Sequence, residues 1–452
     1  MPLLIKGSRL IDPAEGVDGA FDLLIEGGRV ARVDRDIPPR GGDDVLDAGG
    51  LVAAPGFIDV HVHLREPGEE YKEDIESGTR AAAAGGFTAV ACMANTDPVN
   101  DSSSITERIL KRAREAAACR VHPIGAVSAG RRGERLTEMA DQRAAGCVAF
   151  SDDGAPVRTA QLMRSALEYA GMLGVPILDH AEDMSLSGGR VMNEGAISTA
   201  LGLDANPAAS EDICVYRDIR LAALTGSRLH ILHTTSGGAV GLIREAKNKE
   251  IGVTCEVTPH HFTLTDEEIQ GFNSAAKMAP PLRSEADRQA LIAGLKDGTI
   301  EAIASDHAPH YEAELQVEFD ALPFGVVGLE TAVSLALDRL VHSGSLTLAQ
   351  MISKFTAGPA KILGLAGGSL RVGAPGDVTI LDPEREYEVV PEAFESRGRN
   401  TPFGGMKLRG RAAAAIVGGK VVMNRISGET VIDAGFPADA GVREGAGAGE
   451  MN

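Results

Sequence analysis

Short apolar runs alternate with amphipathic segments through the middle of the chain. The apolar runs predict strands at residues 57–63, 88–93, 120–127, 147–151, 176–180, 228–233, 252–257 and 300–305. The amphipathic segments predict helices at residues 71–84, 105–118, 137–145, 159–173, 210–224, 238–249, 285–295 and 328–341. Strands that alternate with helices are typical of a parallel sheet. Eight such pairs predict an α/β protein built on a (β/α)8 TIM-type barrel.

The two ends of the chain have another pattern, in which short strands are separated by glycine turns. Strands are predicted near residues 3–6, 21–26 and 30–33, and again near residues 377–381, 387–390, 412–417 and 420–422. Neither piece can bury a sheet face alone, so we predict that they pair into one small discontinuous β domain. We expect residues 1–54 and 356–434 to form this domain and residues 55–355 to form the barrel. We expect the Gly- and Ala-rich residues 435–452 to form a flexible tail.

Five of the predicted barrel strands end in histidine or aspartate. The first carries His61 and His63, whose side chains point to the same face of an extended strand. Residues of the same kinds close the strands that end near residues 153, 180, 233 and 306. The C-terminal ends of barrel strands share one mouth, so these side chains can converge. Imidazole and carboxylate without thiolate suit zinc or a similar divalent ion, and the pattern predicts a metal-dependent hydrolase.

Composition narrows the class of protein further. The 452 residues suffice for a barrel with a smaller second domain. No apolar run is long enough for a membrane span, and no signal-like segment opens the chain. The five cysteines lack CxxC spacing, which favours reduced thiols and a cytoplasmic location. A formal net charge of −20 disfavours nucleic acid as a partner, and an anionic substrate would depend on local cations.

Longer motifs surround the strand ends. The chain reads GFIDVHVHLREPG at residues 56–68, MANT at 93–96, FSDDG at 150–154, EVTPHH at 256–261, SDHAPH at 305–310 and NTPF at 400–403. In these motifs the chain resembles the class I dihydroorotases of the amidohydrolase superfamily. The resemblance runs from the N-terminal strands to about residue 425.

The resemblance implies a reaction and a set of site residues. Class I dihydroorotases reversibly cyclise N-carbamoyl-L-aspartate to L-dihydroorotate in de novo pyrimidine biosynthesis. One or two zinc ions would be held by the implied ligands His61, His63, Asp153, His180, His233 and Asp306. The substrate would contact the implied residues Arg65, Asn95, His310, Phe324 and Gly325, the last two through their backbone.

The chemistry of amide hydrolysis fits this set of residues. A bound divalent ion lowers the pKa of its water to about 7, and the resulting hydroxide can attack the cyclic amide. Asp306 is the expected general base, which takes the proton of the water and returns it to the leaving nitrogen. Arg65 can bind the carboxylate that both reaction partners carry, through two parallel hydrogen bonds.

The other polar residues near these motifs are expected to have supporting roles. We expect His260 and His261 to form hydrogen bonds behind the ligands, and His307 to be structural. Packing or surface positions are expected for His122, His230 and His342. We expect Lys72 and Glu73 to be solvated charges at the start of a helix.

Two positions depart from the usual family pattern, and four other functions stay open. Ala94 replaces the usual proline, and Ala279 replaces an asparagine whose amide contacts the substrate. Losing that hydrogen bond removes about 0.5–1.5 kcal/mol of binding free energy, so the substrate preference stays open.

A hydantoinase, dihydropyrimidinase or allantoinase-like enzyme would usually carry a carboxylated lysine where this chain has Asp153. A non-catalytic partner of aspartate transcarbamoylase would have lost ligands, and every expected ligand type is present here. A homo-oligomer is also expected.

Overall fold

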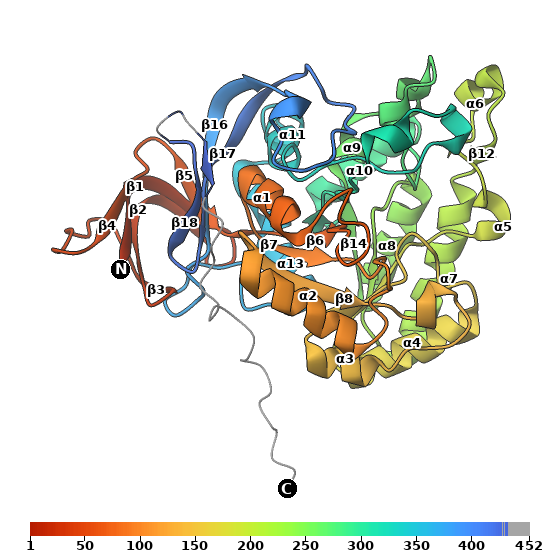
Figure 1. Cartoon of the computed structure of the whole chain (residues 1–452), viewed down its shortest axis with the longest axis horizontal. Coiled ribbons are helices and arrows are strands. Elements are labelled where there is room, and N and C mark those ends of the chain that lie inside the picture. The colour runs from red at the N-terminus through yellow and green to blue at the C-terminus, as the bar shows by residue number, and fades with distance from the viewer. Residues whose placement is uncertain (427, 429, 433–452) are drawn as a thin grey trace, which may run out of the picture.

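The computed structural model describes residues 1–426, 428 and 430–432. Figure 1 shows a barrel of parallel strands and helices on the right, and a second sheet on the left that combines both ends of the chain. The predicted flexible tail, residues 435–452, lies outside the described residues. Among the helices that the structure describes, none combines the length and apolar character needed to cross a membrane.

The barrel is an eight-stranded parallel sheet with the order β15-β14-β13-β10-β9-β8-β7-β6. Its strands are β6 (Phe57–Val62), β7 (Phe87–Cys92), β8 (Arg120–Gly125), β9 (Ala149–Phe150), β10 (Ile177–Asp179), β13 (Leu229–Ile231), β14 (Val253–Val257) and β15 (Ala302–Ile303). All eight predicted strands are present, most of them in shorter form. The gap between β15 and β6 is bridged where His63 N donates to His307 O at 2.9 Å. The predicted (β/α)8 fold is confirmed.

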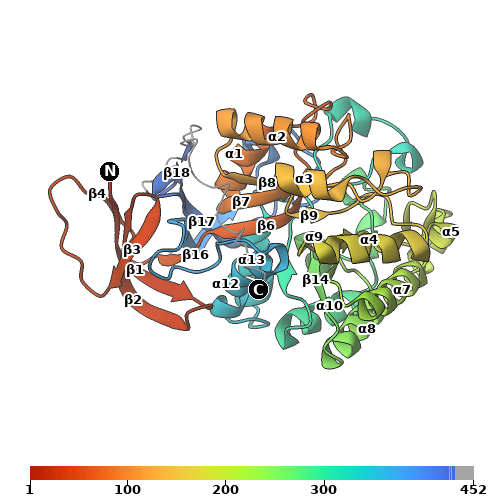
Figure 2. The ribbon, with the colours of Figure 1, turned by 90° about the horizontal axis from the view of Figure 1, so that it is seen from below.

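Helices cover the outside of the barrel, as Figures 1 and 2 show. They are α1 (Ile75–Gly85), α2 (Ser103–Ala116), α3 (Met139–Ala145), α4 (Ala160–Met172), α7 (Ala209–Thr225), α8 (Gly237–Asn248), α10 (Glu285–Asp297) and α11 (Ala332–Ala336). Helix α11 continues into a π-helical turn over Leu337–Val341. Helix α1 begins four residues later than predicted, because the Asp74 side chain accepts a hydrogen bond from Ser77 N at 2.7 Å and caps the helix there.

Several elements were not predicted. The segment between β10 and α7 contains α5 (Met184–Ser187), β11 (Met192–Asn193), α6 (Ala196–Leu201) and β12 (Ala205–Asn206). A short helix, α9 (Pro259–Thr263), follows β14. Beyond the last barrel helix, α12 (Leu348–Phe355) and α13 (Ala357–Leu363) pack against β6. Ile362 and Leu363 of α13 join the apolar interior of the barrel with Ile58 and Val60.

The N- and C-terminal segments form one mixed sheet, as predicted. The strand order is β19-β18-β17-β16-β5-β1-β2-β3, and β4 pairs with β1. These strands are β1 (Leu3–Asp12), β2 (Val17–Glu26), β3 (Arg29–Asp34), β4 (Asp44–Asp47), β5 (Val52–Pro55), β16 (Val378–Glu388), β17 (Lys407–Val417), β18 (Lys420–Asn424) and β19 (Val431–Ile432). Antiparallel pairing of β5 with β16 joins the two ends of the chain. The strands predicted at 377–381 and 387–390 are one irregular strand, β16.

Close contacts fix this sheet against the first barrel strand. The Thr379 hydroxyl donates to Gly86 O at 2.7 Å and accepts from Phe57 N at 3.0 Å. A side chain at Gly86 would place its Cβ 2.5 Å from the Ala412 Cβ, so glycine is required at this contact. The sheet therefore sets the position of β6, which carries the first two predicted ligands.

Candidate metal centre

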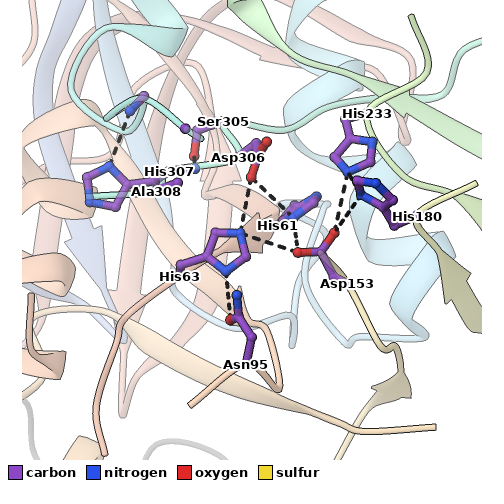
Figure 3. A network of polar contacts seen from close by, with 12 residues as sticks. His61, His63, Asn95, Asp153, His180, His233, Ser305, Asp306, His307 and Ala308 are labelled. Atoms are coloured by element: carbon purple, nitrogen blue, oxygen red, sulfur yellow. Dashed lines mark hydrogen bonds and ion pairs between the residues drawn. The ribbon is translucent and has the colours of Figure 1, made fainter. Parts of the chain in front are cut away.

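The first two predicted ligands lie at the end of β6, next to a β-bulge. Asp59 pairs with Val90 and Val62 pairs with Cys92, so β6 has one more residue than β7 over this stretch. Bulges of this kind re-aim side chains beside active sites. His61 and His63 are both buried, and their ring centres lie 5.3 Å apart. Both rings face the same group of side chains in the barrel mouth (Figure 3).

Asp153 lies at the centre of this group. Its Oδ2 lies 3.4 Å from Nε2 of His61 and 3.4 Å from Nε2 of His63. Its Oδ1 lies 3.4 Å from Nε2 of His233 and 3.6 Å from Nδ1 of His180. One carboxylate therefore lies between two pairs of imidazoles, as Figure 3 shows.

Asp306 approaches the first pair of imidazoles from the other side. Its Oδ1 lies 3.2 Å from Nε2 of His63 and 3.3 Å from Nε2 of His61. The backbone of Asp306 is left-handed, with φ at 47°, and so is that of Arg65 at 60° and of His233 at 28°. Such conformations cost non-glycine residues on the order of 1–3 kcal/mol each, and they cluster at functional sites.

The charges of the site favour a cation. Burial opposes protonation of His61, but Asp153 and Asp306 raise its pKa well above the ordinary value. Burial likewise opposes protonation of His180, but the nearby carboxylates of Asp153 and Glu182 raise its pKa to about 10. Burial would raise the pKa of Asp306, yet His61 and the neighbouring imidazoles hold it below its ordinary value. The carboxylates thus stay ionised and draw positive charge into the site.

The residues present fit a bound metal ion. Within the described part of the chain, His61 Nε2, Asp153 Oδ1 and His233 Nδ1 are buried and have no hydrogen-bond partner. Buried polar atoms without partners are costly unless another group satisfies them. The potential ligand atoms lie within 4.8 Å of one another in three groups, which are His61/His63/Asp153, Asp153/His180/His233 and His61/His233/Asp306. Imidazole and carboxylate donors of this kind suit a divalent ion such as zinc.

A buried carboxylate behind the ligands was missed by the sequence reasoning. Glu256 of β14 is fully buried, and its Oε1 lies 2.8 Å from Nδ1 of His61. Its Oε2 lies 3.0 Å from Nε2 of His230, and it also accepts a hydrogen bond from His233 N at 3.3 Å. Because Glu256 accepts a hydrogen bond from His61 Nδ1, the lone pair on Nε2 of His61 faces the site. The sequence signals were one acidic residue inside an apolar strand and its place at the start of the EVTPHH motif.

The predicted substrate contacts lie around the same mouth. Arg65 is 8 % exposed, its Nε donates to Pro309 O at 3.3 Å, and its Nη1 lies 3.8 Å from Glu69 Oε2. Asn95 Oδ1 lies 2.8 Å from Nδ1 of His63, so the amide oxygen is directed at a potential ligand. His310 Nε2 donates to Phe324 O at 2.8 Å.

Glu73 and Lys72 are not the solvated charges that we expected. Glu73 is fully buried, and its Oε2 lies 3.2 Å from Nε2 of His307 and 2.5 Å from Oγ of Ser396. His307 Nδ1 accepts a hydrogen bond from Gly328 N at 3.2 Å, so its Nε2 is the donor to Glu73. Lys72 is 9 % exposed. The expectation was wrong because the loop before α1 folds inward against residues near 396.

The segment that carries Ala279 is held by His261. His261 Nε2 donates to Pro280 O at 3.0 Å, and its Nδ1 lies 2.6 Å from Oγ1 of Thr258. His261 therefore bonds to a mouth loop and not to a potential ligand. Burial lowers the pKa of His260 to about 4, so this neighbouring ring is neutral at ordinary pH.

Comparisons with known proteins agree with this geometry. Residues 50–238 match the family described as "Dihydro-orotase-like", and residues 249–423 match the "Amidohydrolase family". A protein named dihydroorotase from Citrifermentans bemidjiense is 52 % identical over 422 residues, which cover 93 % of this chain and 99 % of that protein. A dihydroorotase from Pelotomaculum thermopropionicum is 53 % identical over 423 residues, which cover 94 % and 99 %.

Solved structures show the same architecture. The L-hydantoinase (dihydropyrimidinase) from Arthrobacter aurescens superposes with a TM-score of 0.86 at 25 % identity, covering 96 % of this chain and 98 % of that one. The dihydropyrimidinase from Brevibacillus agri superposes with a TM-score of 0.82 at 23 % identity, covering 96 % and 97 %. The barrel and its His/Asp cluster define a metal-dependent cyclic amidohydrolase. Within that class, the chain belongs to the dihydroorotase family.

Proposed function

We propose that this chain interconverts N-carbamoyl-L-aspartate and L-dihydroorotate. Two relatives that are 52 % and 53 % identical to this chain over nearly its whole length are named dihydroorotase, after that activity. The observation that carries the proposal is the place of Asp153, whose two oxygens face two pairs of imidazoles. No lysine is present between residues 112 and 246, so an aspartate and not a carboxylated lysine joins the two halves of the site.

We propose that the metal is zinc and that the ligands on the two sides of Asp153 would hold two ions. His61, His63 and Asp306 would hold one ion, and His180 and His233 the other. Support comes from two groups of ligand atoms, His61/His63/Asp153 and Asp153/His180/His233, which share Asp153. When bound, zinc lowers the pKa of a water molecule to about 7 and polarises an amide carbonyl.

Asp306 is the proposed general acid and base. In hydrolysis it accepts a proton from the water whose oxygen adds to the ring carbonyl carbon. It returns that proton to the ring nitrogen as the C–N bond breaks. In the cyclising direction it takes the proton from the ureido nitrogen. The neighbouring imidazoles keep its carboxylate ionised, which suits the role of proton acceptor.

Arg65 is proposed to bind the substrate carboxylate. Its guanidinium is almost fully buried, and its ion pair with Glu69 is long, with Nη1 3.8 Å from Oε2. A substrate carboxylate would give it two short parallel hydrogen bonds. Hydantoin and dihydrouracil have no carboxylate and would leave this buried charge without a close partner. Asn95, His310 and the backbone of Phe324 and Gly325 are proposed to complete the substrate site.

The domain boundaries, the oligomeric state and a partner protein are also proposals. The pairing of β5 with β16 supports a β domain from residues 1–54 and 356–434, with residues 55–355 as the catalytic barrel. A homo-oligomer and an aspartate transcarbamoylase partner stay predictions from the family resemblance. Light scattering of the purified chain, alone and with the transcarbamoylase of the same organism, tests both.

A substrate panel tests the proposed function. The purified chain, loaded with zinc, is assayed with dihydroorotate, hydantoin, dihydrouracil and allantoin. We expect dihydroorotate to have the highest kcat/KM, and the chain to act without another protein. A preference for an uncharged ring would contradict the proposal and the role of Arg65. Activity with dihydroorotate only after addition of a transcarbamoylase would favour the alternative of a dependent partner subunit.

A further inference from the structure

Lys277 lies between two loops at the barrel mouth, and its side chain is only 1 % exposed. Its Nζ donates to three backbone oxygens, those of Phe319 at 2.7 Å, Asp320 at 3.0 Å and Leu322 at 2.8 Å. These oxygens belong to the 3₁₀ turn Phe319–Ala321 and to the residue that follows it. All three donors of the ammonium are therefore used inside the protein.

The same lysine contacts the next residues of that loop. Its Nζ lies 4.6 Å from the centre of the Phe324 ring, within cation–π range. Gly325 N donates to Lys277 O at 3.0 Å. The side chain and the backbone of one residue thus hold both ends of the segment 319–325.

Two further residues hold this segment from the opposite side. His310 Nε2 donates to Phe324 O at 2.8 Å, and Asn400 Nδ2 donates to Gly325 O at 3.0 Å. Together with the bond to Lys277, these contacts use three of the four polar backbone groups of Phe324 and Gly325. Within the described part of the chain, Phe324 N is the one left without a hydrogen-bond partner. Of the backbone groups of these two residues, Phe324 N is thus the one donor left for a ligand, and the surrounding contacts fix its position.

Holding the loop in this way is energetically costly. Burying an ammonium requires loss of its hydration, and carbonyl dipoles replace that hydration less well than a carboxylate does. Burial accordingly lowers the pKa of Lys277, and the charge of Asp320 offsets only part of this effect. An apolar side chain could fill the same space without that cost. Departures of this kind from the rules of stable packing concentrate at functional sites.

We infer that Lys277 is a positioning residue that holds the backbone of Phe324 and Gly325 against the bound substrate. This inference rests on the proposed function, which places that backbone at the substrate. Lys277 itself contacts neither the potential metal ligands nor the reacting atoms. Its loss is therefore expected to weaken substrate binding while the chemical step is largely kept.

The test compares Lys277→Met with Lys354→Met in the zinc-loaded enzyme. Lys354 is a matched control, because it is also a buried lysine whose Nζ donates to a backbone oxygen, that of Ile300, just before the last barrel strand. Two quantities are measured: amide hydrogen exchange of residues 319–326 without substrate, and the KM and kcat for dihydroorotate. For Lys277→Met we expect exchange and KM to rise about tenfold each, with a much smaller change in kcat. For Lys354→Met we expect no change in either.

Each result decides one part of the inference. Unchanged exchange in Lys277→Met would show that the lysine does not fix the loop. Faster exchange with unchanged KM would show that the fixed loop does not serve the substrate, and either result overturns the inference. If the natural chain does not act on dihydroorotate, the proposed function fails, and the exchange measurement still decides whether Lys277 fixes the loop. If Lys277→Met does not fold, Lys277→Arg is measured instead, because it keeps the charge but spreads the donors apart.

Discussion

Glu256 gives the sharpest test of how the site is held. Its carboxylate is fully buried and accepts hydrogen bonds from the side chains of His61 and His230 and from His233 N. Replacement with glutamine keeps the shape but removes the charge and one accepting oxygen. The amide oxygen can still accept from one of the two imidazoles, but the other ring faces an N–H donor in place of a carboxylate oxygen.

The size of the effect follows from these contacts. A hydrogen bond to a charged group contributes about 1.5–3 kcal/mol. Removing a partner behind a metal ligand typically costs about 10–100-fold in metal affinity. We therefore expect Glu256→Gln to weaken zinc binding about 10–100-fold, which corresponds to about 1.4–2.8 kcal/mol. With zinc in excess, kcat is expected to fall much less.

The assay is a competition for zinc between the protein and a chelator of known affinity. Glu301→Gln serves as the control, because Glu301 is ion-paired with Lys247 and accepts from Cys255 N at 3.2 Å, just before the last barrel strand. This control removes one carboxylate without touching the site, and zinc affinity should not change. Zinc binding by Glu256→Gln as tight as that of the natural chain would refute the reasoning, and so would an equal loss in Glu301→Gln.

Three other changes test the roles of individual residues. Asp306→Asn removes the proton acceptor and should lower kcat by about 10²-fold or more, and an effect on KM alone would show that Asp306 is not the base. Arg65→Met should raise the KM for dihydroorotate and carbamoyl aspartate by about 10–100-fold, since a charged hydrogen-bond pair is lost. Zinc content should not change, and Arg120→Met at the far end of the barrel should leave KM unchanged. Ala279→Asn should preserve kcat/KM for dihydroorotate or raise it by up to roughly tenfold, whereas a marked fall would indicate a pocket shaped for another ring.

The barrel and its ligand cluster were predictable because the relevant signals are local. Each barrel strand is an apolar run of a few residues, and in five of them the histidine or aspartate at the end of the run marks the mouth. Most strands are shorter in the structure than predicted, because the residues at their ends turn toward the mouth. Asp153 lies three residues beyond β9, and Asp306 lies three residues beyond β15. Residues that turn toward a shared centre leave the hydrogen-bonding ladder, so five of the six predicted ligands follow their strands, and only His61 lies within one.

Contacts between distant segments were not predictable. Glu73 bonds to Ser396, which is 323 residues away, and no periodicity or local motif marks that pair. His230 appeared isolated in the sequence, although parallel pairing places it near Glu256 of the next strand. Lys277 likewise finds its partners more than forty residues further along the chain. In each case the polar partner is set by tertiary packing, which local sequence does not encode.

Zinc content measured together with turnover tests the central claim most directly. The chain is depleted of metal with a chelator, dialysed and titrated with zinc, while dihydroorotate hydrolysis and bound zinc are followed in the same samples. We predict that activity disappears with the metal and returns in proportion to bound zinc, up to two ions per chain. Full turnover of dihydroorotate by metal-free protein would contradict the account.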